Sequence, residues 1–347
     1  MSTGRPSAPA EPARLLLNRS VVDDLVLTTI DGAEDFLTED LAHIPVVASI
    51  RRGSGEATCH LHGPLAALHR VRLYATAALP LSAVPGDAAF VDPLRRSANI
   101  GVLSAISSDT PLGFRIGTAA TDLRRDLVSR IESEMGWVND PSSWEVNLEK
   151  GPHGWVAQVG SLHWTRRFGA LERLPWSTTP LVAEVMIRLL KTQPGLTVLD
   201  PLCGTGTLLL AVDHRSPGCT LLGTDRDADA ITKAKINLDR FGVRADLSAS
   251  EAVPIGRPAG SVDRVLSNLP FGKLVGTHQD NEQLYPRLLN EISRVLTPTG
   301  RAVLLTEDKR LLVDSVARTK GLKIVRERLL RHGGATPTAY VLTRTRR

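Results

Sequence analysis

The sequence contains little cysteine, few aromatic residues and no long apolar run. Its three cysteines, Cys59, Cys203 and Cys219, are widely spaced and include no CxxC pair, which argues against a disulfide framework or a thiolate zinc site. No stretch approaches the eighteen or so consecutive apolar residues of a membrane span, and the N-terminal residues carry no apolar core typical of a secretory signal. We therefore expect a cytoplasmic protein without a metal site or a membrane segment.

The bulk composition is that of a folded protein with room for two domains. The chain has 347 residues, of which 42% are hydrophobic and 23% charged, values ordinary for a globular protein. The net charge of +5 is suited to a polyanionic partner but is too small to establish one. Residues 1–14 are rich in Pro, Ala and Ser, a composition that predicts a disordered tail.

Residues 15–165 alternate between strand-like and helix-like patterns and predict an α+β region. Apolar residues recur at every fourth position in Leu123, Leu127, Ile131 and Met135, which predicts an amphipathic helix. The other elements that we expect are strands at 25–30, 113–116, 144–148 and 155–159, a hairpin from 46–51 and 57–61, and helices at 33–41 and 65–74. The Pro- and Gly-punctuated stretch 80–93 separates a first α+β set from a second, which begins at 113.

From Pro180 onward, helices alternate with short apolar strands. This order predicts a parallel sheet with right-handed crossovers, which is a doubly wound α/β domain. We expect helices at 181–190, 208–212, 228–241 and 284–296, strands at 196–199, 221–224, 262–267 and 302–306, a third strand near 245–250, and two last strands at 323–329 and 339–343 that supply an antiparallel edge.

The strongest local signal is a glycine-rich turn between the strand at 196–199 and the next helix. It reads Asp200-Pro-Leu-Cys-Gly-Thr-Gly-Thr207. Gly204 and Gly206 permit a tight backbone close to a ligand, and the following helix offers unpaired N–H groups. The turn lacks the Lys-Ser/Thr ending of a phosphate loop and the GxGxxG spacing. It therefore favours a nucleoside that carries an amino acid, and Cys203 within it is better explained by packing than as a nucleophile.

Acidic residues follow the next two strands. Asp225 ends the strand at 221–224, where an acid in a doubly wound sheet can accept hydrogen bonds from ribose hydroxyls. Glu251 follows the expected third strand and is a candidate acceptor near an adenine amino group. Asp246 competes with Glu251 for that role.

A second motif, Ser267-Asn-Leu-Pro-Phe-Gly272, follows the buried strand at 262–267. The amide oxygen of Asn268 and the carbonyl of Leu269 can accept hydrogen bonds from an exocyclic amine, while Pro270 stiffens the loop and Phe271 offers a stacking face. Two such acceptors help localise the nitrogen lone pair towards an electrophilic methyl group. The motif is typical of methylation of an aromatic amine.

These motifs together resemble the Rossmann-fold RNA methyltransferases with N-terminal THUMP domains. The segments at 200–207, 223–226 and 267–276 carry the likeness, and 268–276, 284–286 and 300–306 are most similar to the tRNA guanine-N2 methyltransferases. Residues 161–168 and 177–183 resemble the family's connector, and 28–34 resembles the start of its ferredoxin-like domain.

The resemblance implies a domain plan, a cofactor and a set of site residues. It implies a tail at 1–14, a ferredoxin-like and THUMP-like RNA-binding region at 15–165, a connector at 166–180 and a class I methyltransferase domain at 181–347. The implied cofactor is S-adenosylmethionine and the implied partner is RNA, with tRNA favoured. The implied catalytic residues are Asn268, Leu269, Pro270 and Phe271; the implied cofactor-binding residues are Thr179, Asp200, Cys203, Gly204, Thr205, Gly206, Thr207, Asp225, Arg226, Glu251 and Asn268.

Alternatives remain open at this stage. The same motif chemistry serves adenine N6 in DNA or ribosomal RNA, and a non-catalytic RNA-binding protein could retain the fold. Arg166 and Arg167 could contact a nucleic-acid backbone or belong to a solvated linker, and the pair His60 and His62 is more typical of strand residues than of a metal site. The sequence does not decide whether a small activator subunit is needed.

Overall fold

A computed structural model describes residues 14–82, 84–117, 120–151, 153–169, 171–271, 278–331 and 333–345. The expected tail lies outside these residues except for Arg14, which is the first residue of a short strand. The chain divides into two compact units, residues 1–29 with 34–169 and residues 30–33 with 170–347. None of the helices in the described part combines the length and apolar composition that crossing a membrane requires.

The first unit is built around one eight-stranded sheet, with strand order β3-β4-β2-β5-β10-β9-β7-β8. These strands are β2 (Ser20–Thr28), β3 (Val47–Arg52), β4 (Glu56–Pro64), β5 (Thr76–Pro80), β7 (Gly113–Ile116), β8 (Val138–Asn139), β9 (Val146–Gly151) and β10 (Gly154–Val159). A separate two-stranded ribbon pairs β1 (Arg14–Leu15) with β6 (Ile106–Ser107). The two α+β sets expected from the sequence therefore share a single sheet, because β5 pairs with both β2 and β10.

The helices of this unit are α1 (Glu34–Ala42), α2 (Leu65–His69), α3 (Asp92–Ile100), α4 (Thr121–Met135) and α5 (Trp164–Arg167), with 3-10 turns η1 (Ala88–Phe90), η2 (Val102–Ala105) and η3 (Gly160–Leu162). The helix expected at 65–74 ends at His69, and β5 and α3 were not among the expected elements. On α4, Leu127 and Ile131 are buried as predicted, whereas Leu123 and Met135 are only half-buried. Sequence periodicity located the helix and overstated its buried stripe.

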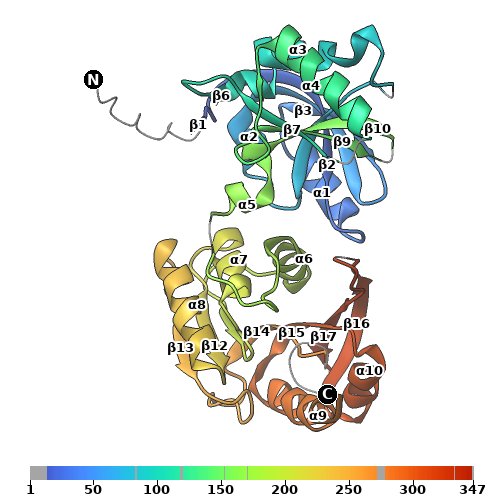
Figure 1. Ribbon diagram of the computed structural model, residues 1–347. Helices are drawn as coiled ribbons and strands as arrows, with labels where there is room; N and C mark the ends of the chain where they lie inside the picture. The colour runs from blue at the N-terminus through green and yellow to red at the C-terminus, as the bar shows by residue number, and fades with distance from the viewer. Residues whose placement is uncertain are drawn as a thin grey trace, which may run out of the picture. The chain divides into compact units, whose positions relative to one another are not determined.

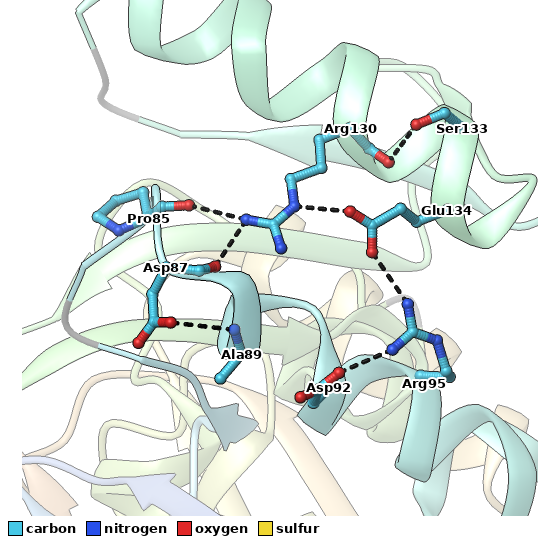
Figure 2. Close-up of polar contacts among 8 residues, drawn as sticks. All are labelled: Pro85, Asp87, Ala89, Asp92, Arg95, Arg130, Ser133 and Glu134. Atoms are coloured by element: carbon cyan, nitrogen blue, oxygen red, sulfur yellow. Dashed lines mark hydrogen bonds and ion pairs between the residues drawn. The ribbon is translucent and has the colours of Figure 1, made fainter.

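Ionic contacts attach α4 to the segment before it (Figure 2). The Arg130 guanidinium donates to Glu134 at 2.8 Å and to the Asp87 carbonyl at 2.7 Å, and Arg95 of α3 donates to the other Glu134 oxygen at 2.9 Å. The Arg130 and Arg95 guanidiniums hold the pKa of Glu134 below its usual value. Arg130 thus serves the packing of α4 on its neighbours.

Arg167 organises the end of the first unit. Its guanidinium donates to the carbonyls of Leu162 at 2.9 Å, Val71 at 2.7 Å and Tyr74 at 2.5 Å, and it lies 3.6 Å from the centre of the Tyr74 ring. The neighbouring Phe168 is 5% exposed. Neither a nucleic-acid contact nor a solvated linker describes Arg167, because its donors are used inside the protein.

The second unit is a seven-stranded sheet of order β13-β12-β11-β14-β15-β17-β16. β13 (Asp246–Ala249), β12 (Thr220–Asp225), β11 (Thr197–Asp200), β14 (Val262–Asn268) and β15 (Leu296–Thr306) run parallel, and β17 (Thr338–Arg344) is antiparallel to both β15 and β16 (Leu322–Leu329). The expected antiparallel strand is confirmed, and it lies inside the sheet, one strand from the edge.

Helices cover both faces of this sheet, as a doubly wound order requires. α6 (Pro180–Leu190), α7 (Thr207–Arg215) and α8 (Ala228–Arg240) pack beside one another, and α9 (His278–Val295) packs with α10 (Lys309–Arg318) on the other face (Figure 1). The core between the sheet and α9 includes Val265, Tyr285, Leu288 and Leu304. Helix α10 was not expected from the sequence.

The anchoring role of Arg167 is testable. Arg167→Ala leaves three carbonyls without their donor, so we expect the free energy of unfolding of the first unit to fall by about 2 to 4 kcal/mol. Urea unfolding followed by tryptophan fluorescence measures this, because Trp137, Trp144, Trp155 and Trp164 all lie in that unit. Arg125→Ala, on an exposed face of α4, is the control. Equal midpoints for the two variants would contradict the assignment.

Candidate active site

The two sequence motifs lie at the carboxyl ends of neighbouring strands. β11 ends at Asp200 and β14 ends at Asn268, and the two strands pair in parallel. The chain leaves β11 towards β12 on one side and reaches β14 on the other, so the order of the sheet reverses between them. Ligands of open α/β sheets bind at such a reversal. The Ser267 hydroxyl donates to Asp200 Oδ1 at 2.9 Å and joins the two ends directly.

The glycine-rich turn has a backbone that other residues adopt with strain. Gly204 and Gly206 have φ values of 51° and 80°, in the left-handed region. A Cβ on Gly206 would lie 3.2 Å from the Ala234 Cβ of α8, whereas a Cβ on Gly204 would meet no atom within 4 Å. The turn therefore packs on the protein at Gly206 and is open at Gly204. Thr207, 6% exposed, begins α7 directly behind it.

Asp225 holds this turn in place. Its Oδ2 accepts the Gly204 N–H at 2.8 Å and its Oδ1 accepts the Asp227 N–H at 3.0 Å, at the start of α8. Each carboxylate oxygen can accept more than one hydrogen bond, so Asp225 can also receive ribose hydroxyls. Arg226 beside it is exposed.

The choice between Glu251 and Asp246 is informed by strand direction. Asp246 begins β13 and forms an ion pair with Arg257, so it lies at the end of the strand away from the motifs. Glu251 follows the carboxyl end of β13 and is exposed, and the neighbouring Ser250 N–H donates to the Asp225 carbonyl at 2.9 Å. The geometry favours Glu251, as proposed from the sequence.

The connector segment before α6 contributes three hydroxyl side chains to the same place. Ser177 Oγ lies 3.0 Å from Thr205 Oγ1, and Asn268 Nδ2 donates to Thr178 Oγ1 at 3.0 Å. Thr179 is the residue before α6, which begins with Pro180. Of these, sequence reasoning named only Thr179; the run of hydroxyl residues directly before a helix-starting proline was the available signal for Ser177 and Thr178.

A hydrogen bond to Thr178 holds the Asn268 side chain. Because Nδ2 is the donor to Thr178, the amide presents Oδ1 on its other side. Asn268 Oδ1 is buried and has no hydrogen-bond partner, and so are Asp200 Oδ2 and Thr179 Oγ1. Buried polar atoms are normally paired. These three polar atoms, at the carboxyl ends of β11 and β14 and on the adjoining connector, are available to a polar ligand.

Burial sets the electrostatics of the turn. Asp200 is 0% exposed, and burial raises the pKa of its carboxyl to about 7, with the charge of Asp225 acting in the same direction. Burial and these two carboxylates also raise the pKa of the Cys203 thiol. A thiol held protonated is a poor nucleophile, which agrees with packing as the role of Cys203.

The target loop continues from Asn268 into a buried anchor. Leu269 is 3% exposed, and its N–H donates to the Leu305 carbonyl at 2.9 Å. Phe271 is half-buried. The rest of the motif, residues 272–276, lies outside the described residues.

The histidine pair of β4 does not form a larger polar cluster. His60 and His62 stack with ring centres 5.9 Å apart, and His60 Nδ1 lies 2.9 Å from Asp24 Oδ1. Across the described ranges, no group of three or more His, Cys, Asp and Glu side chains is arranged to hold a metal.

Part of the chain matches a known protein family. Residues 177–337 match the family described as RMKL-like, methyltransferase domain. This range covers most of the second unit, which is therefore similar to a methyltransferase domain of that kind.

Two relatives extend the similarity. The chain is 28% identical over 249 residues to tRNA (guanine(6)-N(2))-methyltransferase THUMP3 of Bos taurus, covering 65% of this chain and 48% of the relative. It is 32% identical over 174 residues to tRNA (guanine(6)-N2)-methyltransferase of Thermus thermophilus, covering 48% of this chain and 50% of the relative. The chain thus spans about half the length of these relatives. They confirm the family resemblance predicted from the motifs.

A solved structure agrees over most of the chain. TrmN from Thermus thermophilus aligns with a TM-score of 0.70 over 93% of this chain and 99% of that chain, at 23% identity. This likeness confirms the predicted α/β fold class. The THUMP-like nature of the first unit remains a prediction.

Asp200 makes the stability of the second unit depend on pH. Its carboxyl has a pKa of about 7 in the fold, against a usual value of 3.8, so the unfolded chain ionises first. Its contribution to stability is present below the unfolded pKa and is lost as the pH rises to about 7. We expect the parent chain to lose stability over that window relative to Asp200→Asn, which does not titrate. Urea unfolding at several pH values measures the difference, and a difference independent of pH would refute the assignment.

Proposed function

We propose that this chain, as a protein whose second unit is similar to an RMKL-like methyltransferase domain, transfers a methyl group from S-adenosylmethionine to guanine N2 of a tRNA. The observation that carries the proposal is that Asn268 Oδ1 and Asp200 Oδ2 are both buried and unpaired, at the carboxyl ends of two neighbouring strands. A cationic amino acid ligand and an aromatic amine are the groups that these two acceptors would bind. The names of both relatives, which are tRNA guanine-N2 methyltransferases, support the choice of base and RNA.

The residues of the glycine-rich turn fit the cofactor. Asp200 Oδ2 can accept a hydrogen bond from the α-ammonium group of the cofactor, and Thr179 Oγ1 can donate one to its carboxylate. The open side of Gly204 leaves room for a ligand close to the backbone. Asp225 would accept hydrogen bonds from the ribose hydroxyls, and Glu251 would accept one from the adenine amino group. When bound, S-adenosylmethionine supplies a methyl group on a positively charged sulfur.

The target loop prepares the amine for attack. Asn268 Oδ1 and the Leu269 carbonyl would each accept one N–H of the guanine amine, which localises the nitrogen lone pair towards the methyl carbon. Transfer would form a bond between that nitrogen and the methyl carbon while the methyl–sulfur bond breaks and its electron pair stays on sulfur, and the nitrogen would release one proton to water. Both acceptors are set before the base arrives, because Thr178 holds the amide and Leu305 holds the Leu269 N–H.

The rival activities differ in the substrate more than in the site. Adenine N6 offers the same pair of N–H donors, so Asn268 and Leu269 would serve it equally. The relatives favour guanine. A non-catalytic RNA-binding role is disfavoured because the buried, unpaired Asp200 and Asn268 oxygens suit a cofactor and a target amine. We propose that the protein acts in the cytoplasm. The activity assay has to test whether a small activator subunit is needed.

Asp225 provides the test of cofactor binding. Asp225→Ala removes a charged acceptor from the ribose, so we expect the affinity for S-adenosylmethionine to fall by about 1.5 to 3 kcal/mol. Isothermal titration calorimetry measures it. Asp246→Ala removes an acid at the other end of β13 and is the matched control. An Asp225→Ala variant that binds like the parent chain would place the cofactor elsewhere.

Asn268 provides the test of the reaction. Asn268→Ala should lower the single-turnover rate of methyl transfer by roughly two to three orders of magnitude, because one prepositioned polar group is removed from the transition state. Cofactor affinity should change much less. Mass spectrometry of nucleosides from a tRNA substrate identifies the product. N2-methylguanosine supports the proposal; N6-methyladenosine or a parental rate in Asn268→Ala would refute it.

A further inference from the structure

The carbonyl of Pro270, inside the target loop, accepts two hydrogen bonds from one helix. Asn281 Nδ2 donates to it at 2.8 Å and Tyr285 Oη donates to it at 2.8 Å. Both donors lie on α9, one turn apart, on the side that faces the sheet. A carbonyl oxygen has two lone pairs, so these bonds occupy its full capacity.

Both donors are polar groups that lie in the core, where burying an apolar side chain would cost less free energy of desolvation. Asn281 and Tyr285 are each 0% exposed, and Asn281 Oδ1 has no partner. Burying polar groups is unfavourable unless hydrogen bonds compensate. The bond to Pro270 is therefore the interaction that accounts for an asparagine at this position of the core.

The two bonds restrict the backbone torsions of the loop at Pro270. The Pro270 ring fixes φ, and holding the carbonyl oxygen from two directions fixes ψ. On the other side, the Leu269 N–H is held by Leu305 and the Leu269 side chain is buried. The path of the chain from Asn268 to Phe271 is thus set by α9 and β15 together.

Further hydrogen bonds link α9 to the end of β15 and to the residues that follow it. Tyr285 Oη lies 2.8 Å from Thr306 Oγ1 at the end of β15, and Thr306 Oγ1 accepts the Asp308 N–H at 2.9 Å. Asp308 Oδ2 lies 2.7 Å from Nδ1 of His278, the first residue of α9. One continuous set of hydrogen bonds therefore runs from the target loop to the start of α9.

We infer that Asn281 and Tyr285 are positioning residues for methyl transfer: by fixing the Pro270 carbonyl, they keep Asn268 Oδ1 and the Leu269 carbonyl aligned on the target amine. This inference rests on the proposed function. Neither side chain touches the substrate. Both act through the loop, so they affect the rate of transfer and leave cofactor binding at the glycine-rich turn intact.

The experiment compares Tyr285→Phe, Asn281→Leu and the double variant in the full chain. Each single variant leaves one donor on the Pro270 carbonyl, so we expect each to lower the single-turnover rate about five-fold. The double variant leaves none, and we expect a loss of about 100-fold, more than the product of the single effects. Calorimetric affinity for S-adenosylmethionine should stay within about two-fold of the parent value.

Tyr340→Phe is the matched control for loss of a buried hydroxyl. Tyr340 belongs to the same core, is 2% exposed, and its hydroxyl bonds to Thr338 on β17. We expect it to melt at a temperature close to that of Tyr285→Phe while methylating at the parent rate. A parallel loss of rate in both tyrosine variants would make the effect one of stability and would overturn the inference.

A second readout does not depend on activity. Hydrogen exchange of the peptide that covers residues 266–271 should become faster in the double variant and stay unchanged in Tyr340→Phe. Unchanged exchange in the double variant would refute positioning by α9, whatever the rates. A parent chain that methylates no guanine would defeat the proposed function alone, and the exchange result would still decide how the loop is held.

Discussion

The hydrogen bond from Ser267 to Asp200 is the contact on which the site depends, since it joins the carboxyl ends of β11 and β14 where the sheet order reverses. Asp200 is completely buried, so the charge of its carboxylate is opposed by desolvation and supported by few donors. One of its oxygens is used to hold the fold and the other is left unpaired. The fold thus keeps a costly group in place, and a bound cation would offset that cost.

The acceptors of the site are held by segments distant in the sequence. Thr178 orients the Asn268 amide, Asp225 holds the glycine-rich turn, and Asn281 with Tyr285 holds the Pro270 carbonyl. All of these bonds are made between groups of the protein itself. Dipoles arranged in advance need no reorganisation when charge develops at the reacting nitrogen, and this suits a transfer in which the protein contributes orientation more than covalent chemistry.

The first unit uses several of its arginines internally. Arg167 and Arg130 donate to backbone carbonyls, and Arg166 and Arg115 lie over the ring of Trp144. A count of basic residues in the sequence therefore overstates the charge available for a phosphate backbone. We expect RNA binding by this unit, which the family resemblance implies, to rely on its remaining exposed basic groups.

The sequence by itself determined the elements around the glycine-rich turn, the Asn-Leu-Pro-Phe loop and the acids after β12 and β13, because strand ends, positive-φ glycines and proline loops are local features. The sequence patterns did not predict α3 and α10, and they predicted a longer α2 than the structure has. They also divided one sheet into two sets, because no local pattern predicts that β5 pairs with both β2 and β10. Only the tertiary structure decided that Thr178 orients Asn268 across 90 positions of sequence, that burial raises the pKa of Asp200, and that α9 supplies both donors to Pro270. Hydrogen-bond partners and burial depend on which segments meet in space, and a single sequence does not specify that.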